Sequence, residues 1–138
     1  MYIDSDILEK GTLMSNVMVC VTKQKDCQRL ISYGKSLCTG QDDKLYVIHV
    51  AGLDYAFLSS SEDGRALSFL YEKAHEAGAE LTVVKSDDVL ETLTDAVFDK
   101  NIDTVVVGAT HEVEGFDIFL SRFEESVSGK AKIDVVSE

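Results

Sequence analysis

Five short apolar runs alternate along the chain with longer segments that are apolar on one side only. The runs are rich in Val, Ile and Leu, a pattern typical of strands that are covered on both faces in a parallel sheet. We therefore predict strands at Asn16–Thr22, Lys44–Val50, Glu80–Lys85, Asp103–Gly108 and Ala131–Val136.

Four helices are predicted between these strands, because apolar residues recur there at spacings of three and four. The first helix spans Gln24–Cys38 and the second runs from one of the serines at 59–61 to about Ala77, with Gly78 at its C′ position. The fourth runs from Phe116 to Gly129.

The third helix is expected to begin at an acidic turn. Ser86 is predicted to be its N-cap, with Asp87 and Asp88 in the first turn, where carboxylates complement the helix dipole. Capping explains these two aspartates better than a Mg²⁺ site does.

Strict alternation of strands and helices predicts an α/β fold with a parallel sheet, right-handed crossovers and helices on both faces. The 138 residues suffice for one domain. Residues 1–13 show no clear period, so we expect an N-terminal arm there and a single domain over residues 14–138.

Gly108 ends the fourth strand and is followed by a polar loop. In open α/β sheets the ligand lies beyond the carboxyl ends of the strands, so residues Gly108 to His111 should form part of the wall of any site. Thr22 and Lys23 follow the first strand and should lie at the same edge. Lys23 could neutralise a phosphate, although a solvated lysine is the simpler interpretation.

The formal net charge of −12 narrows the range of partners. Such a surface repels nucleic acid and anionic lipid, so neither is expected as a partner, whereas a small anion can still be held by local amides. No apolar run approaches the roughly 18 residues of a membrane helix, and the N-terminus does not resemble a signal peptide, so a cytoplasmic location is expected.

The common catalytic and metal-binding motifs are missing from the sequence, and we expect neither catalysis nor a metal site. His49 is interpreted as a packed or hydrogen-bonded strand histidine, and His111 as a loop histidine that could contact a ligand. Cys20, Cys27 and Cys38 lack metal-type spacing and are predicted to be small buried hydrophobic residues.

Three stretches of the sequence resemble the universal stress protein family: NVMVCVT, VVVGAT and the longer AGAELTVVKSDDVLETLTDAVFDKNIDTVVVG. The resemblance covers residues 16–136 and is greatest to the domain of potassium-sensor histidine kinases of the KdpD type and its small stand-alone relatives. It implies a three-layer Rossmann-like fold, of the adenine nucleotide alpha hydrolase-like type, with strand order 3-2-1-4-5.

ATP-binding members of that family carry an Asp at the end of the first strand and a Gly-x2-Gly-x9-Gly-Ser/Thr loop after the fourth. In this chain Thr22 or Lys23 stands at the Asp position, and Gly108 matches the first glycine of the loop. His111 stands at the second glycine, and Ser121 with Arg122 at the last pair. The added Cβ atoms would narrow a phosphate cradle made of backbone amides.

A smaller pocket is still expected from the resemblance. Val50, Gly108 and Thr110 could shape an adenine or ribose site, so ATP or another adenine nucleotide is a candidate ligand, although no cofactor is certain.

The resemblance also implies a homodimer, often formed through the last strand, where Ile133, Val135 and Val136 would lie on an open edge. We expect a dimeric, non-catalytic regulatory protein of stress signalling that acts through protein partners. The alternatives are a structural interaction module without a ligand, and a weak ATP-binding or ATP-hydrolysing protein.

Overall fold

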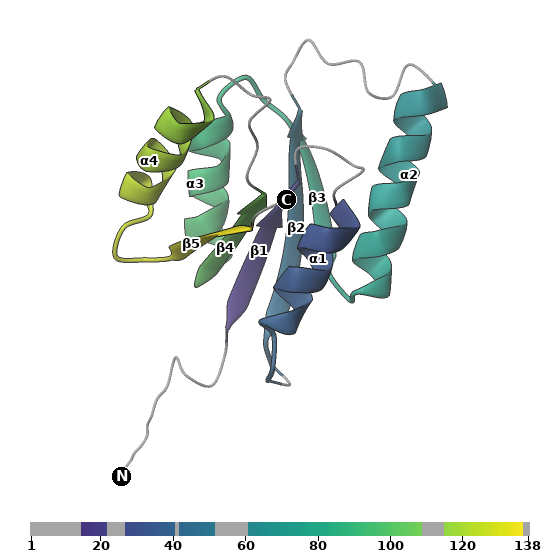
Figure 1. Cartoon of the computed structure of the whole chain (residues 1–138), viewed down its shortest axis with the longest axis horizontal. Coiled ribbons are helices and arrows are strands. Elements are labelled where there is room, and N and C mark those ends of the chain that lie inside the picture. Colours follow the sequence, from purple (N-terminus) through teal and green to yellow (C-terminus); the bar gives the residue numbers. More distant parts are fainter. Residues whose placement is uncertain (1–14, 22–26, 41, 52–60, 109–114, 137–138) are drawn as a thin grey trace.

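The computed structural model describes residues 15–21, 27–40, 42–51, 61–108 and 115–136 (Figure 1). The predicted arm at residues 1–13 lies outside these ranges, as do Thr22, Lys23, Thr110 and His111.

Five parallel strands form one sheet in the order β3-β2-β1-β4-β5, as predicted. The strands are β1 (Asn16–Cys20), β2 (Lys44–Ala51), β3 (Glu80–Lys85), β4 (Thr104–Gly108) and β5 (Lys132–Val136). Each lies within one residue of its predicted start, and β3 coincides with its prediction at both ends.

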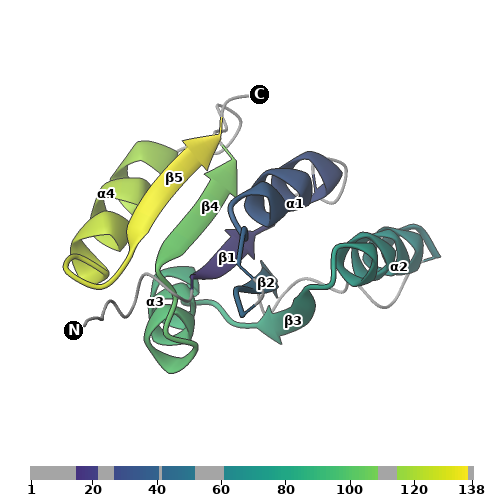
Figure 2. The ribbon, with the colours of Figure 1, turned by 90° about the horizontal axis from the view of Figure 1, so that it is seen from below.

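Four helices cover the two faces of the sheet. They are α1 (Cys27–Ser36), α2 (Ser61–Glu76), α3 (Val89–Asp99) and α4 (Phe116–Ser126). Helices α1 and α2 lie on one face, and α3 and α4 lie on the other (Figure 2). This arrangement follows from right-handed crossovers, because the chain moves toward β3 through α1 and α2 and then turns back toward β5 through α3 and α4.

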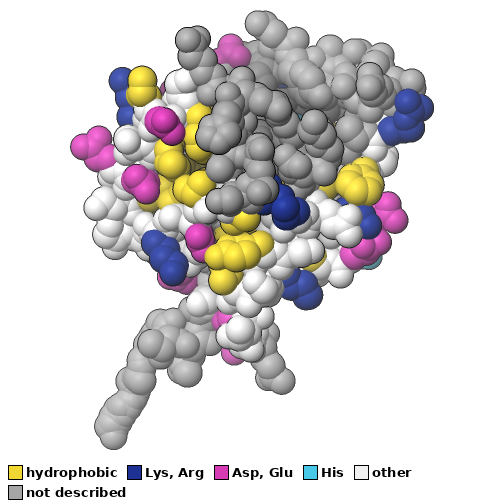
Figure 3. Space-filling model, in the orientation of Figure 1, with side chains coloured by type: hydrophobic (Ala, Val, Ile, Leu, Met, Phe, Trp, Pro, Cys, Tyr) yellow, Lys and Arg dark blue, Asp and Glu magenta, His cyan; other side chains and the backbone are white. Residues whose placement is uncertain are grey.

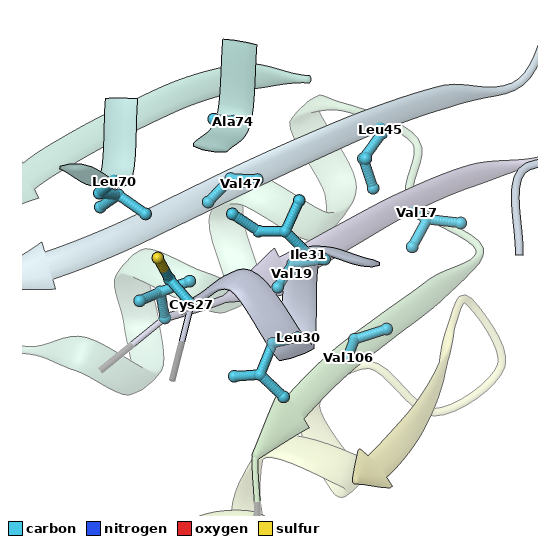
Figure 4. Packing of buried hydrophobic residues seen from close by; sticks show 11 residues of the cluster. Val17, Val19, Cys27, Leu30, Ile31, Leu45, Val47, Leu70, Ala74 and Val106 are labelled. Carbon is cyan, nitrogen blue, oxygen red and sulfur yellow. The ribbon is translucent and has the colours of Figure 1, made fainter. Parts of the chain in front are cut away.

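Alternate residues of each strand separate the core into two clusters. Val17, Val19 and Val21 point toward α1 and α2, whereas Met18 and Cys20 point toward α3 and α4. Figure 4 shows the first cluster, in which the helix residues Cys27, Leu30, Ile31, Leu70 and Ala74 pack on the valines and Leu45 of the sheet. Because a cluster packs on each side, both faces of the sheet are apolar.

The start of α3 differs from the prediction. Its N-cap is Asp88, whose Oδ1 accepts a hydrogen bond of 3.0 Å from the Glu91 amide. Ser86 instead accepts hydrogen bonds from the Asp88 amide (3.1 Å) and the Thr92 hydroxyl (3.0 Å). The prediction of Ser86 as N-cap was wrong. Serine and aspartate both favour the N-cap position, and Asp88, which directly precedes the helix, occupies it.

Two helices end in left-handed residues. Gly78 (φ 73°) follows α2 and Asn101 (φ 54°) follows α3, and in each case the next residue donates its amide hydrogen to a carbonyl five residues back, Ala79 to Ala74 and Ile102 to Val97. Gly78 at the C′ position was predicted. None of the described helices is both long and apolar enough to cross a membrane.

Candidate functional site

The strand order reverses between β1 and β4, which creates a switch point at the carboxyl edge of the sheet, the edge formed by the carboxyl ends of the strands. Cys20 of β1 is in register with Val107, and Gly108 then ends β4 opposite Val136 of β5. Ligands of open α/β sheets bind in the crevice beyond such a point. Gly108 therefore stands where the fold favours a site.

A buried histidine fixes the neighbouring strand ends. The Val21 amide donates to the Ile48 carbonyl (2.9 Å), and Nδ1 of His49 lies 2.8 Å from the Val21 carbonyl. Because a carbonyl only accepts, Nδ1 carries the hydrogen in this pair. The interpretation of His49 as a hydrogen-bonded strand histidine is confirmed, since the residue is 5% exposed.

Helix α1 passes directly over Gly108. A Cβ atom on Gly108 would lie 3.2 Å from Cδ1 of Leu30 and 3.8 Å from Nη2 of Arg29. Leu30 is buried in the core, whereas Arg29 is half-buried at the start of the helix, in a first turn without acidic residues. The structure thus brings a guanidinium to the glycine at the switch point.

The sequence interpretation missed Arg29. The sequence shows that Arg29 lies beside the apolar stripe of α1. The hydrophobic periodicity does not show that this helix packs against the end of β4. A cation in the first turn of the first helix is the signal that could have drawn attention to it.

The two predicted nucleotide-site residues that are described, Val50 and Gly108, lie at carboxyl ends of strands but face different layers. Val50 packs against the cluster under α3 and α4, while the Cβ position of Gly108 faces Leu30 of α1. The fold therefore does not bring the Val50 side chain to Gly108.

The last pair of the family's loop pattern falls inside a helix. Ser121 and Arg122 lie in the middle of α4 and are exposed. Amides in a helix interior donate to carbonyls one turn back, so they are not available to surround a phosphate.

The cysteines offer little reactivity. Burial raises the pKa of Cys20 to about 12, and Cys27 is also buried, as predicted. Cys38 is half-buried and lies beyond the end of α1, although it was predicted within the helix. Its pKa is also raised, mainly by burial and next by the negative charge of Asp43. No disulfide joins these cysteines, and the described residues contain no group of His, Cys, Asp or Glu able to hold a metal ion.

A separate hollow of about 170 Å³ lies between α1 and α2. Its two lysines already have partners: Lys35 donates to the Ala77 carbonyl (3.1 Å), and Lys73 pairs with Glu76 (3.4 Å). The first contact joins α1 to the end of α2 and the second lies within α2, so the hollow is explained by helix packing.

A parallel five-stranded sheet of this order, with helices on both faces and a glycine at the switch point, defines a Rossmann-like α/β domain. Residues 14–137 match the universal stress protein family, and the chain belongs to that family.

Solved structures share the fold at low sequence identity. A universal stress protein in complex with cAMP is 19% identical with a TM-score of 0.56, over 89% of this chain and 94% of that one. A family protein from Arabidopsis thaliana with AMP bound is 20% identical with a TM-score of 0.55, over 90% and 92%. A universal stress protein from Archaeoglobus fulgidus is 20% identical with a TM-score of 0.61, and the match spans 93% of this chain and 45% of that longer chain. A comparison with curated proteins finds no match.

Proposed function

We propose that this chain is a regulatory protein that binds an adenine nucleotide at the carboxyl edge between β1 and β4 and acts without catalysing a reaction. The observation that carries the proposal is Gly108, which ends β4 at the switch point with the guanidinium of Arg29 beside it. The glycine lets α1 pack closely on the end of β4. A cation near this edge favours an anion.

Two relatives support the choice of ligand. The similar structures described above hold cAMP in one case and AMP in the other. Both ligands combine an adenine ring with one phosphate group, and both belong to proteins with the same fold.

The non-catalytic part of the proposal rests on the chemistry of the described residues. The one ionisable side chain among the buried residues of β1 is the Cys20 thiol, whose raised pKa keeps it protonated at neutral pH. His49, at the end of β2, is engaged through Nδ1 in holding the strand ends. We infer that a bound nucleotide is sensed rather than hydrolysed, and an assay of ATP turnover that detects hydrolysis above background would contradict this.

We further propose a homodimer formed through β5, an edge strand that pairs on one side with β4. Apolar side chains gather over α4 and β5 on the face shown in Figure 3. Val135 is 38% exposed and Ile118 of α4 is 64% exposed, whereas Ile133 and Val136 are half-buried against the two core clusters. Of the three residues predicted at the dimer edge, Val135 is therefore the most accessible to a partner.

Light scattering tests the dimer. Val135→Lys should shift the protein toward the monomer, because it places a charge in the apolar contact. Tyr71→Lys, at an exposed position of α2 on the opposite side of the molecule, is the matched control. A wild-type protein that stays monomeric at high micromolar concentration would contradict the proposal.

Calorimetric titration with ATP, ADP, AMP, cAMP and cyclic di-AMP, with and without Mg²⁺, tests the nucleotide proposal. Gly108→Ala should weaken binding, because the added Cβ would lie 3.2 Å from Cδ1 of Leu30 and push α1 away from the end of β4. Gly40→Ala is the control, since its Cβ also meets a side-chain atom (Oδ1 of Asp43) at 3.2 Å but lies in the connection after α1.

Absence of heat with all five ligands would favour the alternative, a structural interaction module that acts through protein partners alone. A cytoplasmic location and the particular likeness to the domain of potassium-sensor kinases stay predictions from the sequence. Cell fractionation tests the first of these.

A further inference from the structure

We propose that the open edge of β3 binds an extended, basic segment of a partner protein, which adds a strand to the sheet beside the outer flank of α2. This inference stands independently of nucleotide binding and of the proposed dimer, because it uses neither Gly108 nor β5. It supplies a contact surface through which a regulatory protein acts on its partner.

The first step of the argument is the regularity of the strand. β3 pairs with β2 over six consecutive residues, Glu80 to Lys85, and no strand lies on its other side in the part of the chain that the structure describes. Its charges stand at the two ends, and the stretch Leu81 to Val84 contains no charge, no proline and no break in register. Charges, prolines and bulges are the features that prevent an edge from pairing, so this edge is able to accept another strand.

The second step is the partial burial of the side chains of β3. Leu81 packs on the core cluster under α1 and α2, so Val83 points to that face, while Thr82 and Val84 point to the other. Val83 and Val84 are half-buried, and neither packs against one of the two clusters of described core residues. An added strand would therefore bury further apolar area on each face of the sheet.

The third step is an aromatic pair on the outer flank of α2. Lys73, Glu76 and Ala77 line the hollow shared with α1, so they mark the flank that faces α1. Tyr71 lies roughly 160° around the helix from Lys73. Helix α2 packs on β3, whereas α1 packs over β1, β2 and β4, so the flank with Tyr71 points past the open edge (Figure 2). Tyr71 is 60% exposed, and its ring stacks on that of His75 with centroids 5.9 Å apart.

Charge favours a basic segment at this edge. The net charge of −12 attracts cations at long range, and the face of the Tyr71 ring attracts an arginine or lysine at short range. Glu72 is exposed next to Tyr71. Asp87 and Asp88 are exposed just after the strand, whose one positive residue is Lys85. A second copy would bring the same acidic residues to this edge, which disfavours pairing of β3 with itself.

Titration of the ¹⁵N-labelled full-length protein with three peptides of about nine residues tests the proposal. The first peptide alternates Arg and Val, the second alternates Glu and Val, and the third is the first with prolines at its centre, which prevent strand pairing. We expect the Arg-Val peptide to shift the amide signals of Tyr71 and of Leu81 to Val84. It should also slow hydrogen exchange at alternate amides of β3, because alternate residues of a strand direct their N–H groups to the same side. The other two peptides should bind at least about 10-fold more weakly.

A pair of variants on α2 tests the position of the added strand. Tyr71→Ala should weaken binding of the Arg-Val peptide about 3- to 10-fold, because it removes the ring that attracts the guanidinium. Phe69→Ala is the matched control, since Phe69 is an exposed aromatic residue on the flank that faces α1, with the Lys73 ammonium 5.3 Å from its ring centroid. Its affinity should equal that of the wild type, with both variants folded by circular dichroism.

Four results would contradict the proposal. Equal affinity for the Arg-Val and Glu-Val peptides would overturn the preference for a basic segment. Equal affinity for the Arg-Val and proline peptides, or equal effects of the two variants, would overturn strand addition beside Tyr71. A wild type that does not bind the Arg-Val peptide at millimolar concentration would overturn the whole proposal. Light scattering that reports association beyond a dimer, abolished by Val83→Lys, would assign the edge to a second copy instead. Nucleotide binding is unaffected by each of these results.

Discussion

The two edges of the sheet use polar side chains in different ways. At the amino edge, where the strands begin, they bind backbone groups of neighbouring connections. The Asn16 side chain donates to the Lys100 and Asn101 carbonyls at 3.2 and 3.0 Å, and Asp43 accepts from the Ser15 and Gly40 amides at 2.7 and 2.9 Å.

At the carboxyl edge the described polar groups are fewer, and one of them lies beside the glycine that ends β4. His49 holds the end of β1, but the guanidinium of Arg29 lies beside a glycine. The comparison indicates that polar groups at the amino edge stabilise the fold, while Arg29 at the carboxyl edge lies beside the proposed ligand site. The predictions below separate these two roles.

Gly34→Val should have the largest effect, because it disturbs the helix that links both edges. A Cβ at this position already meets Cγ2 of Val19 at 2.5 Å, and the two further methyl groups of valine have no space. We expect a loss of about 3 kcal/mol or more in the free energy of unfolding, measured by urea denaturation. Ser36→Val, at an exposed position of the same helix, should cost less than about 1 kcal/mol. Equal losses in the two variants would show that α1 is not closely packed at Gly34.

Asn16→Ala should cost about 2 kcal/mol, because it removes two hydrogen bonds and leaves carbonyls after α3 without their donor. Nucleotide affinity should not change, since the residue lies at the opposite edge from Gly108. Gln28→Ala, an exposed amide on α1, is the control for stability. A variant as stable as the wild type would contradict the structural role of the amino edge.

Asp43→Asn should have an effect that depends on pH. Hydrogen bonds from the Gly40 amide, and next from Ser15, hold the pKa of Asp43 below its ordinary value in the folded protein. The unfolded chain therefore binds a proton more readily, so the stability contributed by the carboxylate is present above the ordinary aspartate pKa of about 4 and is lost as the pH falls below it. The difference in urea midpoint between wild type and variant should shrink from pH 7 to pH 3. Asp42→Asn, at the exposed neighbouring position, should show no such trend.

Arg29→Ala should have the smallest effect on stability, less than about 1 kcal/mol in urea denaturation, because the side chain is half-buried at the start of a helix whose other face carries the core contacts. A loss as large as that of Asn16→Ala would remove the distinction between the two edges and assign Arg29 to the fold.

The architecture could be predicted from the sequence because hydrophobic periodicity is a local property. The runs of Val and Ile identified all five strands, and the apolar stripes identified the four helices. Choices between adjacent residues of similar chemistry were less certain, as the N-cap of α3 shows, where Ser86 was predicted and Asp88 is found.

The candidate site could be predicted only in part. Gly108 was identified because a glycine after an apolar run is a local signal, but its contact with Arg29 depends on how α1 packs on β4, two elements far apart in sequence. The register of the sheet likewise decides that the Val50 side chain and the Cβ position of Gly108 face opposite layers. Packing relations of this kind leave no mark on the periodicity of either element.

The measurement that tests the central claim most directly is a titration of the ¹⁵N-labelled protein with AMP, followed through the amide chemical shifts. We predict shifts that concentrate at Val21, Arg29 and Gly108 and leave Asn16 and Asp43 at the amino edge unchanged. Shifts confined to the amino edge or to the hollow between α1 and α2, or no shifts at millimolar AMP, would contradict the account.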